Sequence, residues 1–407
     1  GGIITNTGAS ATLTVTSSTN TTFSGVIKDG SASNLLSLTK AGVGTLTLSG
    51  TNTFTGVTTL TAGTLSVATI NAGGVAGNLG QASADAGNLV LNGGTLQYTA
   101  TGTTASTNRA FTLMPGTMST IEVTSATSVL TMSGASASTN GSLIKTGSGT
   151  LILSGANNFS GTTNITGGSL VLGNSLALQF STLNLTNSGF SYGSFNDVTL
   201  GGLSGNSPLA LTSTATSPGV TLRVGNNNAN TLYSGILSGA TGSLVKVGSG
   251  TLTLSGTNSF GGSTTVSEGI LRLGDGGSTG SVAASAVTAN GTGTFLVDRS
   301  DLITLASLVG GSEIAGTGNI TVQSNANIDI NRTINLSGSN SAITIRAGNN
   351  IVAGTATGGD VTLTNTIKTA DSGTVTITRY RCDRCGTSWE YENNKADQHA
   401  GWSVVGG

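Results

Sequence analysis

Short runs of alternating apolar and polar residues recur along the chain, and most are bounded by glycine. In Thr45–Leu48, Thr150–Leu153 and Thr251–Leu254, leucine occupies every second position, with threonine or isoleucine between. A period of two is typical of a half-buried β-strand. The pattern therefore predicts an all-β chain built from strands of about four to six residues.

Three segments, at residues 38–67, 143–172 and 244–273, are near copies of one another. They read LTKAGVGTLTLSGTNTFTGVTTLTAGTLSV, LIKTGSGTLILSGANNFSGTTNITGGSLVL and LVKVGSGTLTLSGTNSFGGSTTVSEGILRL. Each copy predicts a strand through its paired leucines and two further strands, separated by glycine-rich corners. The apolar residues central to the second and third strands are Leu60, Ile165, Val266, Leu65, Leu170 and Leu271.

Strand, corner, strand, corner and strand over about 20 to 30 residues is the pattern of one turn of a parallel β-helix. No single turn buries its own apolar face, so the turns must stack. We therefore expect residues 1–378 to form a β-solenoid. The alternative is a β-sandwich or an antiparallel array, which would need tight hairpin turns between well-separated strands.

The predicted corners carry the same residue types in all three copies. Glycines flank the first strand, where a sharp corner is expected to need a conformation closed to residues with a Cβ. Phenylalanines are expected to fill the core at a corner, and the lysines and asparagines to serve corner geometry and polar ladders rather than a ligand site. These residues are Gly44, Gly149, Gly250, Gly50, Gly155, Gly256, Phe54, Phe159, Phe260, Lys40, Lys145, Lys246, Asn52, Asn157 and Asn258.

The shared core, K-x-G-x-G-T-L-x-L-S-G-x-N-x-F-x-G, resembles the passenger-associated transport repeat of autotransporter proteins. Residues 88–113, with Arg109 in an N-R-A context, also resemble autotransporter passenger sequence, and residues 342–363 resemble the haemagglutinin-type repeats of exported exoproteins. These resemblances imply a right-handed parallel β-helix that is exported across the outer membrane to the bacterial cell surface, where it acts in adhesion or surface structure.

Composition narrows the possible partners. Only 8% of residues are charged and the formal net charge is -1, so the basic stripe that nucleic acid requires is not expected. No apolar run approaches the roughly 18 residues of a membrane-spanning helix. The chain opens at Gly1 without a signal peptide and ends without membrane strands, so we expect a cleaved passenger, a fragment or a separately exported fibre subunit.

After Thr378 the composition changes, and residues 379–407 are predicted to form a separate tail module. Cys382 and Cys385 form a C-x-x-C pair, with His399 as a possible third ligand, which indicates a zinc site. The segment resembles the first half of a zinc ribbon whose second C-x-x-C is absent. A Cys382–Cys385 disulfide, free thiols and a truncated remnant are the alternatives.

Catalysis is not predicted. His399 is the only histidine, so a hydrolytic triad has no base near the repeats. Asp298 and Asp301 are the nearest approach to a carboxylate pair in the solenoid, which makes a polysaccharide-degrading enzyme a remote alternative. Calcium binding at residues 274–277, GDGG, is equally weakly indicated, because the repeated Gly and Asp pattern of calcium β-rolls is missing.

Two functions compete at this point. One is a surface adhesin passenger that offers its polar faces and loops to host proteins, glycans or other cells. The other is a structural fibre, in which open solenoid ends stack head to tail into a filament. The strand-like alternation in IITNTGASATLTVT, at the start of the chain, favours self-association, whereas the family resemblance favours adhesion.

Overall fold

The computed structural model describes residues 1–215, 219–284, 286–301, 303–304, 313–324, 328–330, 333–336, 342–347, 361–363, 367–368, 374–379, 388–390 and 403–405. The chain divides into two compact units. Unit 1 comprises Gly1–Gly201 with Ser213–Thr216, and unit 2 comprises Gly202–Thr212 with Ser217–Gly407. In each unit the paired strands up to β42 are parallel, which confirms the predicted β-solenoid.

The elements are short and follow the alternating runs of the sequence. Unit 1 contains β1 (Ile3–Thr5), β2 (Ala11–Val15), β3 (Thr21–Phe23), β4 (Val26–Lys28), β5 (Leu36–Lys40), β6 (Thr45–Leu48), β7 (Thr58–Leu60), β8 (Thr64–Val67), the 3₁₀ turn η1 (Ala86–Asn88), β9 (Leu89–Leu91), β10 (Thr95–Tyr98), β11 (Thr104–Thr107), β12 (Thr112–Leu113), β13 (Met118–Val123), β14 (Val129–Met132), β15 (Ser142–Thr146), β16 (Thr150–Leu153), β17 (Thr162–Ile165), β18 (Ser169–Leu172), β19 (Leu178–Leu185) and β20 (Phe190–Ser191). The division between the units falls within β21 (Asp197–Gly205). Unit 2 contains β22 (Leu209–Ala210), β23 (Thr221–Val224), β24 (Thr231–Tyr233), β25 (Leu237–Ser238), β26 (Ser243–Lys246), β27 (Thr251–Leu254), β28 (Thr257–Asn258), β29 (Thr264–Val266), β30 (Ile270–Leu273), β31 (Ser281–Val282), β32 (Val287–Ala289), β33 (Thr294–Arg299), β34 (Ile303–Thr304), β35 (Glu313–Gly316), β36 (Asn319–Ser324), β37 (Ile328–Ile330), β38 (Thr333–Leu336), β39 (Ala342–Ala347), β40 (Val361–Leu363), β41 (Ile367–Lys368), β42 (Thr374–Arg379), β43 (Ser388–Glu390) and β44 (Ser403–Val405).

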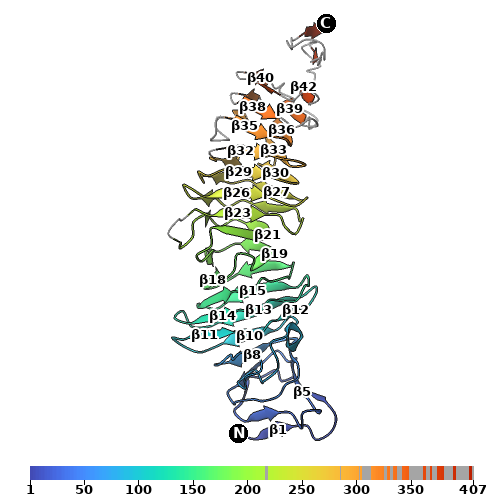
Figure 1. Ribbon diagram of the computed structural model, residues 1–407, viewed down its shortest axis with the longest axis vertical. Coiled ribbons are helices and arrows are strands. Elements are labelled where there is room, and N and C mark those ends of the chain that lie inside the picture. The colour runs from blue at the N-terminus through green and yellow to red at the C-terminus, as the bar shows by residue number, and fades with distance from the viewer. Residues whose placement is uncertain are drawn as a thin grey trace. The chain divides into compact units, whose positions relative to one another are not determined.

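Unit 1 is built from three long parallel ladders and the short parallel pair β1–β4. The first joins β3, β6, β8, β10, β13, β15, β17 and β19. The second joins β2, β5, β7, β9 and β12, and the third joins β11, β14, β16, β18 and β20. Strands that are neighbours in one ladder are separated in sequence by strands of another, so the chain winds from ladder to ladder and returns one layer further along (Figure 1).

Unit 2 repeats this winding with two long ladders. One joins β23, β26, β29, β32, β35, β38 and β41, and the other joins β24, β27, β30, β33, β36, β39 and β42. Beyond β42 the pairing changes, because β43 and β44 are antiparallel to each other. The tail boundary at residues 378 and 379 stays a prediction.

The core of each unit is lined by the alternate apolar residues of the strands. In β6, Leu46 and Leu48 are buried, whereas the alternate residues Thr45 and Thr47 are half-buried on the outer face. Phe54, Phe159 and Phe260 are all at most 1% exposed, which confirms that they fill the core. The period of two therefore reports one face on the core and one face in water.

The prediction that one repeat copy forms one solenoid turn is wrong. In the second copy, Leu151 of β16 pairs with Leu170 of β18, and Lys145 of β15 pairs with Ile165 of β17. The third predicted strand, β18, thus stacks on the first, β16, and Lys145 lies on β15, a strand that was not predicted. Each copy supplies two successive turns of two strands, and Thr162 meets Ser142 after only 20 residues.

The glycines at the corners act mainly through close approach of the backbone. Gly155 does not have a positive φ, contrary to the expected reason for its presence. A Cβ on Gly155 would lie 2.6 Å from the carbonyl oxygen of Gly134 in the preceding turn, so any side chain would push the turns apart. The left-handed conformation occurs instead at Gly147, where φ is 72°.

Candidate functional site

Each of the three repeats buries one lysine against backbone oxygens. Lys145 is fully buried, and its Nζ donates to the carbonyl oxygens of Thr146 at 2.6 Å, Gly147 at 3.0 Å and Gly167 at 3.0 Å. Thr146 ends β15, Gly147 begins the corner that follows it, and Gly167 lies at the corner of the next turn. The ammonium group therefore fastens two successive turns, and we call this arrangement the lysine staple.

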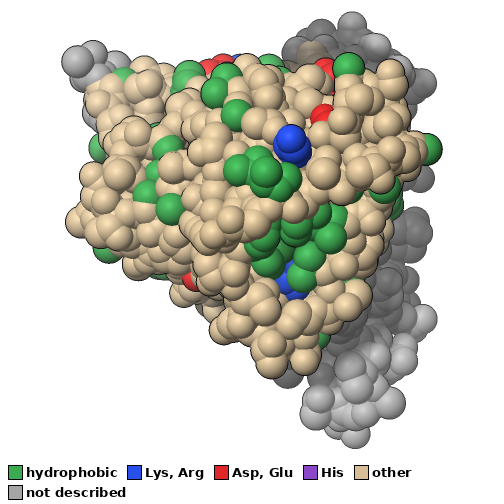
Figure 2. Space-filling view, turned by 90° about the horizontal axis from the view of Figure 1, so that it is seen from below, with side chains coloured by type: hydrophobic (Ala, Val, Ile, Leu, Met, Phe, Trp, Pro, Cys, Tyr) green, Lys and Arg blue, Asp and Glu red, His purple; other side chains and the backbone are tan. Residues whose placement is uncertain are grey.

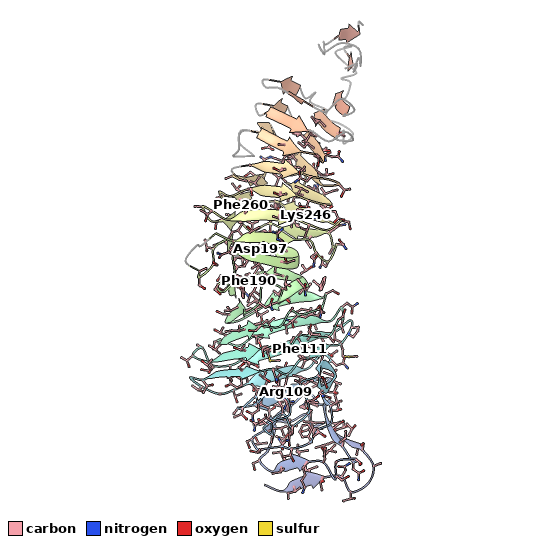
Figure 3. The ribbon with its side chains drawn as sticks, in the orientation of Figure 1. Arg109, Phe111, Phe190, Asp197, Lys246 and Phe260 are labelled. Carbon is pink, nitrogen blue, oxygen red and sulfur yellow. The ribbon has the colours of Figure 1, made fainter. Side chains whose placement is uncertain are left out.

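The lysine staple recurs in the other two copies. Lys246 donates to the carbonyl oxygens of Val247 and Gly248, both at 2.6 Å, and of Glu268 at 3.3 Å (Figure 3). Lys40 donates to the carbonyl oxygens of Gly42 and Ala62. In all three copies a lysine ammonium group bonds carbonyl oxygens at the same two corners. The lysine staple is therefore a property of the repeat.

The lysine staples bury the ammonium groups of the three lysines away from water. Burial lowers the pKa of Lys145 and Lys246 to about 8, although the carboxylates of Glu122 and Glu268 each oppose the shift for their nearby lysine. Burial also lowers the pKa of Lys40. All three ammonium groups are enclosed by carbonyls of their own solenoid, so none is presented to a ligand.

The repeat asparagines join turns at a second corner. The buried Asn157 accepts a hydrogen bond from the backbone N–H of Ser136, in the turn before, at 2.8 Å. Its Nδ2 donates to the carbonyl oxygen of Ala177, in the turn after, at 3.0 Å. Asn52 and Asn258 also accept from the preceding turn and donate to the following one. The structure thus supports the expected structural role of these residues.

A buried arginine fixes the segment between β8 and β9, residues 68–88, which we call the 68–88 loop. Arg109 is 3% exposed, and its guanidinium donates to the carbonyl oxygens of Asn71 at 3.0 Å, Ala82 at 3.1 Å and Gly80 at 2.8 Å (Figure 3). Burial lowers the pKa of Arg109. Because one planar group bonds three points of the loop, the loop is held in one shape on the surface of unit 1.

The carboxylates considered for catalysis are engaged with arginines. Arg272 bonds Asp298 through Nε, at 2.8 Å, and Nη2, and Arg299 bonds Asp301 through Nε, at 2.8 Å, and Nη2, at 2.6 Å. The hydrogen bonds from Arg299 lower the pKa of Asp301. A glycosidase acid needs a raised pKa, and the pKa of Asp301 is shifted in the opposite direction.

The predicted zinc site lies outside the described residues, since Cys382, Cys385 and His399 all fall in undescribed segments. Among the residues that are described, no three His, Cys, Asp or Glu side chains gather closely enough to hold a metal. Asp275 of the GDGG segment is exposed, and its carboxylate accepts a hydrogen bond from the N–H of Gly277. Within the same described part of the chain, no helix has the length and apolarity needed to cross a membrane.

The described strands form a parallel β-solenoid whose corners are joined by the lysine staples. All three copies, at residues 38–67, 143–172 and 244–273, match the passenger-associated-transport-repeat family. The chain is also 38% identical over 253 residues to the adhesin BmaC autotransporter of Brucella suis biovar 1 (strain 1330), a match that covers 60% of this chain and 7% of that relative. No solved structure matches the chain significantly. The resemblance to autotransporter passengers is therefore confirmed, and it supports export to the bacterial cell surface.

Proposed function

We propose that this chain is part of an autotransporter passenger that acts, without enzymatic activity, as an adhesin at the bacterial cell surface. The observation that carries the proposal is the 38% identity to an autotransporter adhesin over 253 residues. The matched region is only a small part of the relative. We therefore propose that in this chain the solenoid serves as a scaffold and that its loops make the adhesive contacts. Host-surface proteins and glycans are the partners that an uncharged, polar surface of this kind would meet.

The 68–88 loop is the first part of the surface to test for adhesion. Binding residues are often carried by loops that a rigid scaffold holds in place, and Arg109 holds this loop at three points. Near its tip, Val75 is 51% exposed, so the loop presents an apolar side chain to solvent. A fixed loop loses little conformational entropy when a partner binds.

The experiment displays the full chain on a non-adherent laboratory bacterium and counts cells attached to cultured epithelial cells. The display scaffold alone is the baseline. We expect attachment above this baseline, and a reduction by Val75→Asp. Val43→Asp is the matched control, because Val43 is 76% exposed in the same unit but lies at a repeat corner. Attachment no higher than baseline would contradict the adhesin proposal, and equal effects of the two variants would remove the loop from it.

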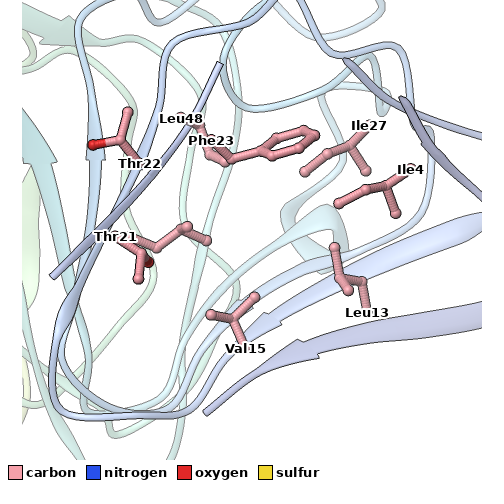
Figure 4. A pocket seen from close by; sticks show the side chains of 9 residues that line it. Ile4, Leu13, Val15, Thr21, Thr22, Phe23, Ile27 and Leu48 are labelled. Atoms are coloured by element: carbon pink, nitrogen blue, oxygen red, sulfur yellow. The ribbon is translucent and has the colours of Figure 1, made fainter. Parts of the chain in front are cut away.

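A filament subunit is the second candidate function. An apolar hollow of about 250 Å³, lined by residues of β1, β2, β3, β4 and β6 (Figure 2 and Figure 4), favours it, because apolar surface of this kind can be buried against another molecule. Electron microscopy of the purified chain tests it: filaments would support the fibre, and isolated particles at all concentrations would contradict it.

A further inference from the structure

Three asparagines of the sequence, Asn92, Asn140 and Asn290, are followed directly by glycine. Such a pair can modify itself, because the backbone nitrogen of the glycine can attack the side-chain amide carbon of the asparagine. The attack closes a succinimide ring and releases ammonia, and water then opens the ring to aspartate or isoaspartate. Glycine favours ring closure, since it has no Cβ to obstruct the ring and restricts the backbone least. The folded surroundings of each pair therefore decide where the reaction proceeds.

At two of the three pairs the attacking nitrogen is engaged in a hydrogen bond. The N–H of Gly93 donates to the hydroxyl oxygen of Ser119 at 2.9 Å, and the N–H of Gly291 donates to the hydroxyl oxygen of Thr317 at 3.0 Å. Each hydroxyl belongs to the next turn of the solenoid. Ser119 is fully buried, so its hydroxyl is held in place. Either glycine nitrogen has to give up this bond before it can attack.

The two engaged pairs lie at equivalent corners of the solenoid. The backbone N–H of Asn92 donates to the carbonyl oxygen of Leu60 at 2.7 Å, and that of Asn290 donates to the carbonyl oxygen of Val266 at 2.8 Å. Leu60 and Val266 occupy the same position in the first and third repeats. The turn that follows these two repeats thus combines an Asn-Gly corner with a hydroxyl group that binds the glycine nitrogen.

The pair formed by Asn140 and Gly141 has the opposite arrangement. Within the residues that the structure describes, the N–H of Gly141 donates to no hydrogen-bond acceptor. Asn140 is exposed, and its Oδ1 accepts a hydrogen bond from the N–H of Gly116 at 3.2 Å. Negative charge develops on Oδ1 when the amide carbon is attacked, so this donor stabilises the charge where it forms. Exposure also lets ammonia leave and water enter.

We propose that Asn140 is a site of spontaneous deamidation in the folded protein. At the other two pairs the same reaction is suppressed by the hydroxyl groups of Ser119 and Thr317. The net reaction consumes one side-chain amide and one water molecule and yields one carboxylate and one ammonium ion. In the isoaspartate product the backbone runs through the former side-chain carbon, so the corner before β15 gains one backbone atom. Each event also adds a negative charge to a chain whose formal net charge is -1.

The test compares the folded full chain with the same chain in concentrated urea. Both are incubated at mildly alkaline pH, which favours loss of the proton from the glycine nitrogen, and mass spectrometry of peptides then distinguishes acid from amide at each pair. In urea the three pairs should react at similar rates, because all are Asn-Gly. In the folded chain Asn140 should react about tenfold faster than Asn92 or Asn290, the effect expected when one hydrogen bond has to break.

Two variants isolate the protecting hydroxyl groups. Ser119→Ala should speed deamidation of Asn92 in the folded chain by about tenfold and leave Asn290 unchanged. Thr317→Val, which keeps the branched shape, should speed deamidation of Asn290 alone. Asn140→Gln is the matched control for the third pair, because glutamine has to close a larger ring that forms more slowly. Its peptide should keep the mass of the amide.

In the folded chain, deamidation of Asn92 or Asn290 at the rate of Asn140 would overturn the proposal. So would an Asn140 amide that outlasts the other two. If Ser119→Ala and Thr317→Val keep the circular dichroism of the wild type and leave all three rates unchanged, the hydroxyl groups do not protect. The mass of each peptide is measured without host cells, so failure here is separable from failure of the adhesin proposal.

Discussion

Replacing Lys145 with methionine should destabilise the second repeat strongly. Methionine fills a similar volume, so the change removes the ammonium group without leaving a large cavity. Three carbonyl oxygens lose a charged donor, at about 1.5–3 kcal/mol each. The fall in the pKa of Lys145 from 10.5 to about 8 corresponds to roughly 3 kcal/mol of unfavourable burial, which methionine avoids. We therefore expect a net loss of about 2–5 kcal/mol.

The assay combines urea unfolding, followed by circular dichroism, with hydrogen exchange at Thr166, whose N–H donates to the carbonyl oxygen of Lys145 at 2.9 Å. The exchange measurement is needed because solenoids can open turn by turn rather than in one step. Lys28→Met is the matched control, since Lys28 is exposed in the same unit and should change stability by no more than about 0.5 kcal/mol. If Lys145→Met is as stable as Lys28→Met, the staple does not hold the turns together.

Four further predictions follow from the contacts of single residues. The pKa of Lys145 and Lys246 is about 8 in the folded chain, lower than in the unfolded chain, so the unfolded chain binds more protons between pH 8 and pH 10. The free energy of unfolding should therefore rise with pH over that interval, and it should rise less steeply in Lys145→Met. A fall in the free energy of unfolding of the wild type over the same interval would contradict this. Asn157→Ala should lower the free energy of unfolding in urea by about 2–4 kcal/mol, because the buried N–H of Ser136 and the carbonyl of Ala177 lose their partners. Asn158→Ala, at the exposed neighbouring residue, should leave it almost unchanged. Equal losses in the two variants would show that Asn157 does not join the turns. Arg109→Met should free the 68–88 loop, so limited proteolysis should cut within it well before the rest of unit 1, and unchanged resistance would show that other contacts fix the loop. Native mass spectrometry should find one zinc ion per chain that Cys382→Ser abolishes, whereas a metal-free chain lighter by two hydrogen atoms would identify the Cys382–Cys385 disulfide instead.

Much of the fold could be predicted because the leucine pairs report local geometry directly. Leu46, Leu151 and Leu252 lie on strands as expected, since an alternation of period two has one consistent interpretation once glycine bounds it. The number of turns in one repeat could not be predicted in the same way. The number of turns depends on which strands become neighbours. The alternating pattern around Leu65 is the same whether its strand forms a third side of one turn or stacks on the strand of Leu46, as it does in the structure.

The lysines and the loop arginine show the limit of pattern reasoning about sites. Charged residues are almost never fully buried, so sequence alone gives no reason to place Lys145 or Arg109 inside. Their partners are backbone carbonyls, which every residue carries, so no second side chain in the sequence marks the contact. The available signal was positional: a lysine that recurs at the same place in three copies, directly before a glycine corner, indicates a structural contact.

The most direct test of the stacked-turn account is disulfide trapping between β16 and β18 in a Cys382→Ser, Cys385→Ser background. Thr150 and Ser169 pair in register on the outer face, and the Cα atoms of such neighbours lie about 5 Å apart, within disulfide range. Val171 lies on the same face two residues further along, which places it about 8 Å from Thr150, too far to bridge. The account predicts that Thr150→Cys with Ser169→Cys forms a disulfide under mild oxidation and that Thr150→Cys with Val171→Cys does not. The reverse result, or no disulfide in either chain, would contradict the parallel register on which the solenoid rests.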